Sequence, residues 1–410
     1  MTASDKSHGA ERITVLLVDQ GASFGGSLVV AANLARSLDA SRFRCIIAAE
    51  ADREFVEYRF HGAAEVHLLP HAFNYATWER VNTFAQRVPT VVARKAFLYG
   101  MSAVRFLVNS LYAARVLALV FRERVDLIHL NNGIGNVEAF LVSVLTRRPH
   151  VVHVHGLDKL GTVERFLFRR AKRVISISQA VSRAITDYGV EPARLTTLPN
   201  PVVPVPMAPS DRSDVRERYC IPSDSMVVAL FGRVVRWKGQ LEFLRAAADA
   251  VAAIPGALIM IVGDAADGND EYSARVLAFV DSRRIRDRVI FTGFVDDVDA
   301  VYAAVDVVVH ASIEPEPFGL VITEAMSHGI PVIASTLGAP VEIIEDGVTG
   351  FLVNPADTAA LAESIGRLLR DPQLRSEIGA RGRGHVLKTY AADRYARAME
   401  EVYLEALKAD

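Results

Sequence analysis

The chain has 410 residues, which is more than one ordinary hydrophobic core accommodates, so two domains are expected. Its apolar fraction of 51% and charged fraction of 23% are typical of a folded globular protein and exclude a disordered chain. The two cysteines, Cys45 and Cys220, are too far apart in sequence to indicate a disulfide framework or a metal motif, and a reducing compartment fits best.

The N-terminal residues 1–19 have no apolar core behind a basic start, so no signal peptide is predicted. The most membrane-like window, residues 101–120, contains Arg105 and Arg115, which argues against a spanning helix. We therefore predict a cytoplasmic protein, with peripheral contact on the cytoplasmic face of a membrane as a further hypothesis.

Short apolar runs alternate with helical segments along the whole chain. In the first half the runs cover residues 13–19, 43–51, 64–70, 125–132, 150–156, 173–178 and 195–200. In the second half they cover residues 225–233, 257–265, 288–294, 305–312, 330–336 and 350–353. Strands that are apolar on both faces and separated by helices are typical of parallel sheets covered on both sides.

The fold class is therefore α/β, with two doubly wound, Rossmann-like domains. We assign residues 1–201 to the first domain and 202–390 to the second, and residues 391–410 to a helix expected to pack back on the first domain. The proline-rich stretch 200–214 is interpreted as the linker. Two such domains are expected to face an interdomain cleft at the carboxyl ends of their strands, where open parallel sheets bind ligands.

The first strand leads into "DQGASFGGSL" (Asp19–Leu28), a glycine-rich turn before a helix. Gly25 and Gly26 have no side chains, so a phosphate or a sugar can approach the backbone there. The Gly-x-Gly-x-x-Gly pattern of nicotinamide sites is absent. A tight strand–helix turn without any ligand is the alternative.

Residues 87–124 are basic and rich in aromatic residues, with Glu123 as their one acid. Residues 1–201 carry 25 basic and 17 acidic residues (+8), whereas residues 202–410 carry 21 and 31 (−10). A basic, aromatic helical region of this kind is suited to an anionic membrane surface. An internal helix pair with solvated arginines is the alternative, and no nucleic-acid partner is expected.

Histidines gather near one strand of the first half, in "PHVVHVHG". His153 and His155 share a face of that strand, and His155 lies nearest its carboxyl end. No thiol or carboxylate motif accompanies them, so a metal site has little support. We interpret His153 as a core residue and His155 as the one placed to meet a ligand.

The loop "LFGRVVRWKG" (Leu230–Gly239) follows the first strand of the second half and precedes a helix. Arg233, Arg236 and Lys238 then lie beside a helix N-terminus, where backbone N–H groups already favour an anion. Two or three added cations suit a diphosphate. The alternative is a solvated basic loop; the spacing of a P-loop is absent.

Asp297 and Asp299 form an Asp-x-Asp string that holds a metal in some nucleotide-sugar enzymes. The string coincides with a predicted helix start, where aspartate caps are common, so we favour capping and predict no metal.

Further on, Glu316 precedes a Pro-Phe-Gly turn, and Glu324 follows inside an apolar helix. A buried carboxylate needs a partner, and carboxylates accept hydrogen bonds from sugar or ribose hydroxyls. Paired carboxylates also suit a glycosidase, which would leave the cationic loop without a role.

The strings "FGRVVRWKG", "IVGDA", "EPEPFGLVITEAM", "GIPVIAS" and "GVTGFLV", with the softer "GGSL", "HVHG" and "VISISQAVSRAI", carry a resemblance to a known family. The chain resembles retaining glycosyltransferases of family 4, which have the GT-B fold, over nearly its whole length. It departs from the family at "PNPVV" (Pro199–Val203), where Pro-Asn-Gly-Val-Asp is common.

The resemblance implies a role for each site residue. Arg233 and Lys238 would hold the donor diphosphate, while Gly25 and Gly26 would let the first domain approach it. Glu324 would bind the ribose. Catalytic roles would fall to Glu316, which would contact the donor sugar, and His155, which would lie near the reacting centre. The backbone of Phe318, Gly319 and Leu320 would lie alongside the sugar.

The expected activity is retaining, metal-independent hexosyl transfer without a cofactor. A UDP- or GDP-linked sugar would be moved to a hydroxyl of a glycan or lipid-linked acceptor in cell-surface polysaccharide synthesis. A nucleotide-sugar epimerase and a non-catalytic membrane-associated nucleotide-sugar-binding protein are the alternatives. The motifs do not distinguish uracil from guanine.

Overall fold

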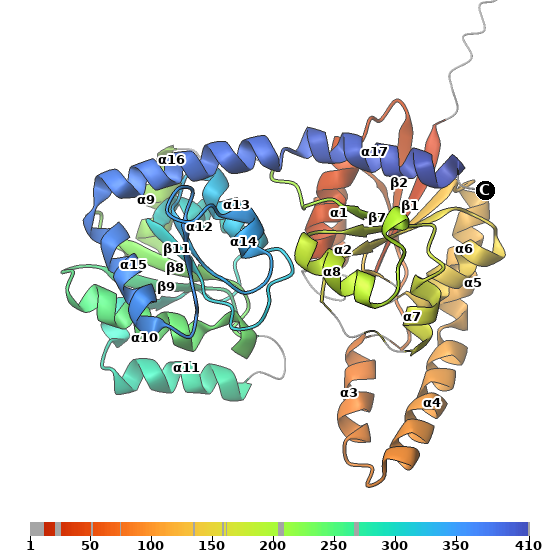
Figure 1. Cartoon of the computed structure of the whole chain (residues 1–410), viewed down its shortest axis with the longest axis horizontal. Helices are drawn as coiled ribbons and strands as arrows, with labels where there is room; N and C mark the ends of the chain where they lie inside the picture. The colour runs from red at the N-terminus through yellow and green to blue at the C-terminus, as the bar shows by residue number, and fades with distance from the viewer. Residues whose placement is uncertain are drawn as a thin grey trace, which may run out of the picture. The chain divides into compact units, whose positions relative to one another are not determined.

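A computed structural model of the chain describes residues 12–20, 26–50, 52–73, 75–133, 136–157, 160, 162–203, 209–265 and 270–408. The chain forms two compact units. Unit 1 comprises residues 1–177, 181–199 and 392–410, and unit 2 comprises residues 178–180 and 200–391. Each unit contains one parallel sheet with helices packed against it (Figure 1).

Unit 1 contains a seven-stranded sheet in the order β3-β2-β1-β4-β5-β6-β7. Its strands are β1 (Ile13–Asp19), β2 (Phe43–Ala49), β3 (Glu65–Leu68), β4 (Leu127–Leu130), β5 (His150–Val154), β6 (Arg173–Ser176) and β7 (Leu195–Thr197). Its helices are α1 (Gly26–Ser37), α2 (Arg53–Phe60), α3 (Tyr75–Ala85), α4 (Val91–Val108), α5 (Ser110–Arg122), α6 (Val137–Leu145), α7 (Thr162–Phe168), α8 (Gln179–Asp187) and α17 (Ala392–Lys408). The first two residues of α8 are grouped with unit 2.

Unit 2 contains a six-stranded sheet in the order β10-β9-β8-β11-β12-β13. Its strands are β8 (Val227–Phe231), β9 (Leu258–Val262), β10 (Val289–Phe291), β11 (Val307–His310), β12 (Val332–Ser335) and β13 (Phe351–Val353). Its helices are α9 (Pro209–Arg218), α10 (Gln240–Ala252), α11 (Asp270–Ser282), α12 (Val298–Ala304), α13 (Leu320–Ser327), α14 (Pro340–Ile343), α15 (Thr358–Arg370) and α16 (Pro372–Thr389).

The central strands are buried on both faces, which explains why they are continuously apolar in sequence. In each unit the first strand lies inside the sheet: β1 pairs with β2 and β4, and β8 pairs with β9 and β11. The strand order therefore reverses at β1 and at β8. Loops that leave the carboxyl ends of strands at such a switch point diverge and leave room for a ligand.

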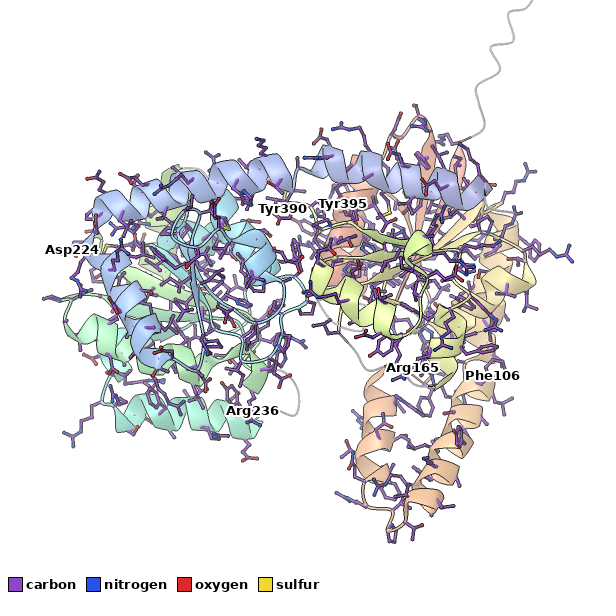
Figure 2. The ribbon with its side chains drawn as sticks, viewed as in Figure 1. Phe106, Arg165, Asp224, Arg236, Tyr390 and Tyr395 are labelled. Carbon is purple, nitrogen blue, oxygen red and sulfur yellow. The ribbon has the colours of Figure 1, made fainter. Side chains whose placement is uncertain are left out.

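Helix α17 packs on α1 within unit 1. Its buried Tyr403 donates or accepts a 2.6 Å hydrogen bond with His129 Nδ1, and Glu400 pairs with Arg42 at 2.8 Å. Tyr395, labelled in Figure 2, lies on the same helix and is also buried. The last helix thus supplies core residues to the unit that contains β1.

The linker interpretation of residues 200–214 is wrong for its last part, because α9 begins at Pro209. Proline is tolerated in the first turn of a helix, where its missing N–H would have no intrahelical partner. The proline content therefore extended the predicted linker past the point where α9 begins. Residues 204–208 lie outside the described part.

The basic region 87–124 is divided between α4 and α5, which bend by 42° at a short break. Among the described residues, no single helix has the length and composition to cross a membrane, although this bent pair does when counted together. The two helices differ in their environment. Tyr112, Val116, Leu119 and Val120 of α5 are buried, whereas α4 has no buried residue.

Candidate functional site

The switch point of unit 2 brings a cation and a carboxylate together. A short 3-10 turn (Arg236–Lys238) follows β8, and Lys238 Nζ lies 2.8 Å from Glu316 Oε2. Gly239 then starts α10 with φ of +75°, and a Cβ atom there would lie 1.9 Å from the carbonyl oxygen of Ala311. Only glycine allows this close approach of the loop to the end of β11, so the turn holds Lys238 beside Glu316.

Glu316 is 6% exposed and is held through one carboxylate oxygen. Oε2 accepts from Lys238, from Ser312 Oγ at 3.1 Å and from His310 Nε2 at 2.9 Å. Among the described residues, Oε1 has no hydrogen-bond partner. Burial alone would raise the pKa of Glu316, but the hydrogen bond from His310 and the charge of Lys238 hold that pKa well below its ordinary value. The side chain is therefore an ionised acceptor with one oxygen still available.

The backbone of Glu316 is fixed as firmly as its side chain. Its N–H donates to Leu337 at 3.1 Å, and its carbonyl accepts from Ala339 at 2.9 Å. Gly338, with φ of +87°, lies so close that a Cβ atom would be 2.3 Å from the carbonyl oxygen of Glu316. The loop after β12 thus determines where Glu316 points.

The other predicted cations are more exposed. Arg233 and Arg236 are both exposed, and neither guanidinium has a side-chain partner among the described residues. Figure 2 labels Arg236 on unit 2. Lys238 differs from both because its ammonium group is 4.0 Å from the ring of Trp237 as well as bonded to Glu316. Of the three basic residues, the structure brings only Lys238 directly to Glu316.

Helix α13 begins immediately after Glu316. Gly319 is its N-cap residue and makes no side-chain cap, and the N–H groups of Leu320 and Val321 have no acceptor among the described residues. Phe318 is buried against Tyr390, with ring centroids 5.8 Å apart, so only its backbone remains for a ligand. These free N–H groups and the helix dipole favour an anion beside Lys238.

Glu324 lies further along α13 and is half-buried. The hydroxyl of Tyr302 donates to its Oε2 at 3.2 Å, and the Tyr302 ring is stacked on Phe231 at 4.2 Å. Burial, followed by the charge of Glu324, raises the pKa of Tyr302 well above its ordinary value, so its hydroxyl keeps its proton. One partner of Glu324 is therefore a tyrosine near the end of α12, which the sequence analysis did not consider.

At the switch point of unit 1, the hydrogen-bond donors to the carboxylate are neutral asparagine side chains and not a lysine. Asp19, which ends β1, accepts from Asn131 at 2.6 Å and from Asn132 at 3.1 Å, both just after β4. Asn131 Oδ1 lies 3.3 Å from His155 Nε2, just after β5. The structure thus connects His155 to β1 through Asn131. Gly26, the first residue of α1, is exposed, and Gly25 lies outside the described residues.

Behind His155 lies a stack of histidines. The ring of His153 is 4.1 Å from that of His155 and 5.3 Å from that of His129. Burial lowers the pKa of His155 and that of His129 to about 3, and lowers that of His153 well below its usual range. His153 is fully buried, as expected for a core residue. All three rings are neutral at physiological pH, so His155 acts there as a neutral hydrogen-bonding group.

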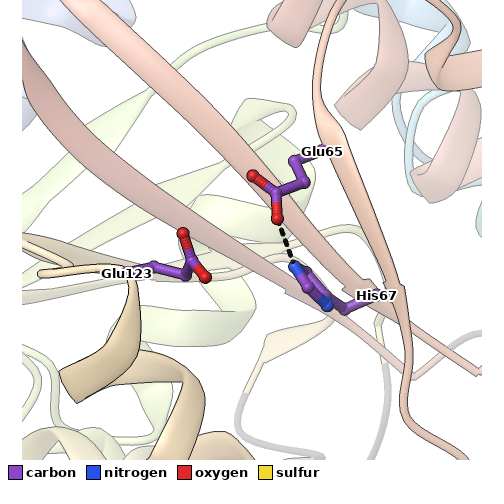
Figure 3. A group of neighbouring side chains, drawn as sticks. All are labelled: Glu65, His67 and Glu123. Atoms are coloured by element: carbon purple, nitrogen blue, oxygen red, sulfur yellow. Dashed lines mark hydrogen bonds and ion pairs between the residues drawn. The ribbon is translucent and has the colours of Figure 1, made fainter.

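A group of potential metal ligands also lies at the β3 edge of the unit 1 sheet. Glu65, His67 and Glu123 approach one another, and His67 Nε2 is 2.9 Å from Glu65 (Figure 3). Arg44 Nη2, however, lies 2.7 Å from a carboxylate oxygen of each glutamate. The arginine already supplies the positive charge that a metal would bring, so this group is explained as an ion-pair network.

The Asp-x-Asp string caps a helix, as predicted. Asp297 is the N-cap residue of α12, and its Oδ1 accepts from the N–H of Ala300 at 3.1 Å. Asp299 is bonded to His328 at 2.9 Å. Both carboxylates therefore have protein partners.

Comparison with known proteins defines the class. The family model for Glycosyl transferases group 1 matches residues 211–385, and that for Glycosyltransferase Family 4 matches residues 24–204. The chain therefore belongs to the family 4, group 1 glycosyltransferases, and its two-domain α/β fold is that of GT-B glycosyltransferases. The resemblance drawn from the motifs is confirmed.

Individual relatives share a quarter to a third of their residues with the chain. D-inositol 3-phosphate glycosyltransferase of Salinispora arenicola is 30% identical, with 69% of each chain covered. N-acetyl-alpha-D-glucosaminyl L-malate synthase of Bacillus anthracis is 25% identical, over 73% of this chain and 79% of that protein. Anabaena HepE, whose crystal structures include complexes with UDP and with UDP-glucose, is 25% identical with a TM-score of 0.78. That comparison covers 96% of this chain and 100% of HepE.

Proposed function

We propose that this glycosyltransferase moves a hexose from a UDP-sugar to an acceptor hydroxyl with retention of anomeric configuration. The single observation that carries the proposal is the buried Lys238–Glu316 pair at the switch point of unit 2, in which the carboxylate Oε1 has no partner within the described part of the chain. The UDP-glucose complex of HepE supports uridine over guanosine for the donor.

The donor diphosphate needs positive charge and N–H donors at one place. Lys238 supplies a largely buried ammonium group, Arg233 is exposed on the same loop, and Leu320 and Val321 present backbone N–H groups at the start of α13. Negative charge builds on the diphosphate as the glycosidic bond breaks. Fixed donors in a buried site stabilise that developing charge more strongly than water does.

The donor's sugars need hydrogen-bond acceptors. Oε1 of Glu316 would accept from hydroxyls of the transferred sugar, beside the backbone of Phe318, Gly319 and Leu320. Glu324, oriented by Tyr302, would accept from the ribose diol. Lys238, His310 and Ser312 all bind Oε2 and so fix the orientation of the carboxylate. Oε1 then remains available to accept hydrogen bonds from the sugar.

The first unit would contribute neutral groups. His155, half-buried and uncharged, would lie near the anomeric centre and donate to a sugar hydroxyl or accept from it. Gly25 and Gly26 would allow the turn after β1 to approach the diphosphate. An acceptor carried on a lipid suits the excess positive charge of residues 1–201, since such acceptors reach the enzyme at a membrane surface.

The reaction breaks the bond between the anomeric carbon and the diphosphate oxygen and forms a bond from that carbon to the acceptor oxygen. The acceptor would attack from the face that the diphosphate leaves, and the departing phosphate oxygen would take the acceptor's proton. This route needs no protein nucleophile. Lys238 and Arg233 provide the charge stabilisation, so no step is assigned to a metal ion.

The test separates donor binding from transfer. Glu316→Gln keeps the size of the side chain but removes its charge, and we expect turnover of UDP-glucose to fall by about 10²–10³-fold because the group acts in the transition state. UDP should still raise the melting temperature, since a ligand at 100 times its Kd adds about 2.7 kcal/mol. GDP serves as the matched ligand and should stabilise less.

An epimerase would convert the donor's sugar in the absence of acceptor, so product analysis without acceptor distinguishes that alternative. Full turnover by Glu316→Gln, or equal stabilisation by UDP and GDP with conversion of the donor alone, would contradict the proposal.

A further inference from the structure

The two helices α3 and α4 form an arm (residues 75–108) that extends from the rest of unit 1 (Figure 1). No residue of the 18-residue α4 is buried, although the helix is strongly apolar. Neither the switch-point sites nor the family assignment gives this arm a role. Its surface therefore requires a separate explanation.

One face of α4 is accounted for by α3. The ring of Phe97 lies 5.7 Å from that of Phe84, and the guanidinium of Arg105 lies over Trp78 at 5.8 Å. Half-buried Met101 lies between them in the helical repeat. These contacts define the inner face of the arm.

The opposite face of α4 is also apolar but is not covered. Residues spaced three and four apart along it form one stripe at helical periodicity, and all of them are exposed: Val92, Ala96, Tyr99, Ala103 and Phe106. Val92 is 80% exposed, Tyr99 68% and the adjoining Leu107 73%. Figure 2 shows Phe106 on the side of α4 that faces away from α3. A continuous apolar stripe of this length on a water-exposed helix indicates an interaction surface.

Charge indicates the kind of partner. Residues 75–108 contain one acid, Glu79, and five basic residues: Arg80, Arg87, Arg94, Lys95 and Arg105. Apart from the Tyr99 hydroxyl, the outer stripe has no polar group that would pair with a specific protein surface. Arg80, Arg87 and Lys95 are exposed, whereas Arg105 stacks on Trp78 at the inner face. An exposed apolar helix face on an arm of net positive charge matches the interface of an anionic bilayer, where apolar side chains enter the acyl boundary and cations meet the headgroups.

We propose that the outer face of α4 docks on the surface of an anionic membrane, with the helix lying in the plane of the interface. The bent pair of α4 and α5 does not cross the bilayer, because α5 is committed to the core of unit 1 through Tyr112, Val116, Leu119 and Val120. The sequence predicted membrane contact for residues 87–124, and the present inference assigns that contact to the outer face of α4 in the arm (residues 75–108). It is independent of the donor chemistry proposed above.

Flotation of the full chain with vesicles tests this directly. Vesicles of phosphatidylcholine alone are compared with vesicles that also contain phosphatidylglycerol, at low and high salt. The triple variant Tyr99→Ser, Phe106→Ser, Leu107→Ser removes exposed apolar groups only. Its matched control is Val144→Ser, Leu145→Ser, because these two residues of α6 are 54% and 76% exposed in the same unit but lie outside the arm. A third variant, Arg87→Gln, Lys95→Gln, removes two exposed charges.

We expect the unmodified chain to float with the anionic vesicles at low salt and to be released at high salt. The triple variant should bind at least about 10-fold more weakly. The charge variant should bind about 30-fold more weakly, since each cation near such a surface contributes about fivefold. The control should bind normally, and UDP-induced stabilisation should be the same in every variant.

Three results would overturn the inference. These are failure of the unmodified chain to float with anionic vesicles, equal loss in the α6 control, and self-association that the triple variant abolishes while vesicle binding is unchanged. The last result would assign the stripe to a contact between two copies of the chain. Because donor binding is measured in parallel, failure of the membrane inference is distinguishable from failure of the proposed activity.

Discussion

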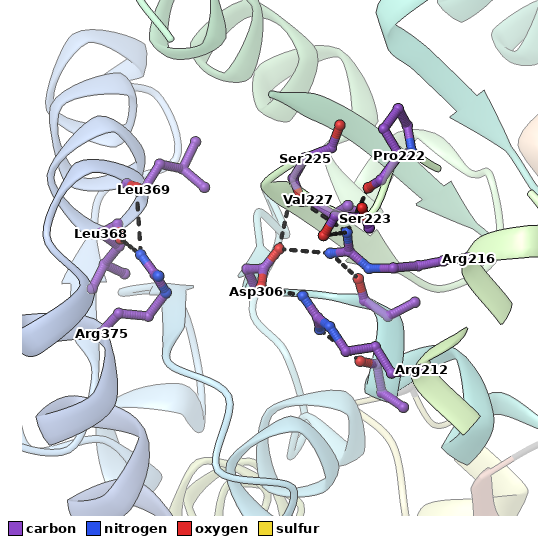
Figure 4. A network of polar contacts seen from close by, with 12 residues as sticks. Arg212, Arg216, Pro222, Ser223, Ser225, Val227, Asp306, Leu368, Leu369 and Arg375 are labelled. Carbon is purple, nitrogen blue, oxygen red and sulfur yellow. Dashed lines mark hydrogen bonds and ion pairs between the residues drawn. The ribbon is translucent and has the colours of Figure 1, made fainter. Parts of the chain in front are cut away.

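Strands β8 and β11 have a buried ion pair at each end, and the two pairs are built differently. At the carboxyl ends Lys238 meets Glu316, whose Oε1 has no partner among the described residues. At the amino ends Arg216 meets Asp306 at 3.2 Å (Figure 4). Arg216 also donates to four backbone carbonyls, those of Pro222, Ser223, Ser225 and Ala304.

Both carboxylate oxygens of Asp306 accept hydrogen bonds. Its Oδ1 accepts from Arg212 at 2.9 Å, and its Oδ2 accepts from Arg216 and from the N–H of Val227 at 2.8 Å. This pair joins α9 to the starts of β8 and β11, and each oxygen of its carboxylate has a protein partner. A carboxylate oxygen without a partner among the described residues, rather than burial or charge, therefore distinguishes the candidate functional pair from the structural one.

The largest expected effect comes from breaking the structural pair. Asp306→Ala leaves the Arg216 charge buried without its carboxylate, and this should lower the free energy of unfolding by about 3–5 kcal/mol. The chain has two tryptophans, and Trp237 belongs to unit 2, so a Trp78→Phe background makes its fluorescence report on that unit during denaturant unfolding.

Arg212→Gln is the matched control, because Arg212 also pairs with Asp306 but is 44% exposed. It should cost no more than about 1 kcal/mol. Activity per folded molecule should be unchanged in both variants. Loss of activity in folded Asp306→Ala would remove the distinction between the two pairs.

Breaking the other pair should affect activity more than stability. Lys238→Ala removes the buried donor to the diphosphate, and kcat/KM for the UDP-sugar should fall by about 10²–10³-fold, or about 2.7–4 kcal/mol. Arg236→Ala is the control, since Arg236 is two residues before Lys238, is exposed and makes no described hydrogen bond to Glu316. Equal losses in the two variants would mean that the loop acts only through its net charge.

Much of the fold was predictable because the strands of both sheets are apolar on both faces and are separated by helical segments. Strand order was less accessible, since periodicity indicates that β8 is a strand but not that it pairs with both β9 and β11. The proline-based linker failed at Pro209 because proline is also a helix starter.

The site was predicted as single residues and not as a network. Glu316 and Lys238 were identified, but their direct contact depends on Gly239 and on the loop around Gly338, which only the tertiary structure reveals. His310 was overlooked although it directly ends β11. The signal that could have found it was a polar residue terminating an apolar strand six positions before Glu316.

The buried histidines of unit 1 predict a pH effect with a definite sign. Because burial holds the pKa of His129 and His155 at about 3 in the folded chain, these rings are neutral there, whereas the unfolded chain binds protons below about 6.5. The stabilisation is complete above that pH and is lost as the pH falls toward 3. Stability should therefore decrease between pH 6 and 4, by up to about 1.4 kcal/mol per pH unit for each histidine.

His153→Leu sharpens this test. Neither ring nitrogen of His153 has a hydrogen-bond partner among the residues that the structure describes, so leucine removes no known bond and should leave stability near neutral pH little changed. The slope of unfolding free energy against pH should become shallower by the contribution of one histidine. Urea unfolding at several pH values, followed by circular dichroism, measures the slope, and an unchanged slope would show that His153 does not titrate on unfolding.

The smallest expected effect concerns Asp297, whose carboxylate caps α12 in the same unit as Glu316 but has its acceptor capacity directed to the backbone. Asp297→Ala should lower stability by about 1 kcal/mol, the usual value of an N-cap, and Asp297→Asn should restore it because asparagine also accepts from the helix N–H. Turnover should be the same for both variants, with a chelator and with added magnesium or manganese. If Asp297→Ala instead lost activity and added metal restored it, the Asp-x-Asp string would be a metal site. A carboxylate that accepts from the local backbone could then still be functional. An oxygen without a described partner would then no longer separate structural from functional carboxylates in unit 2.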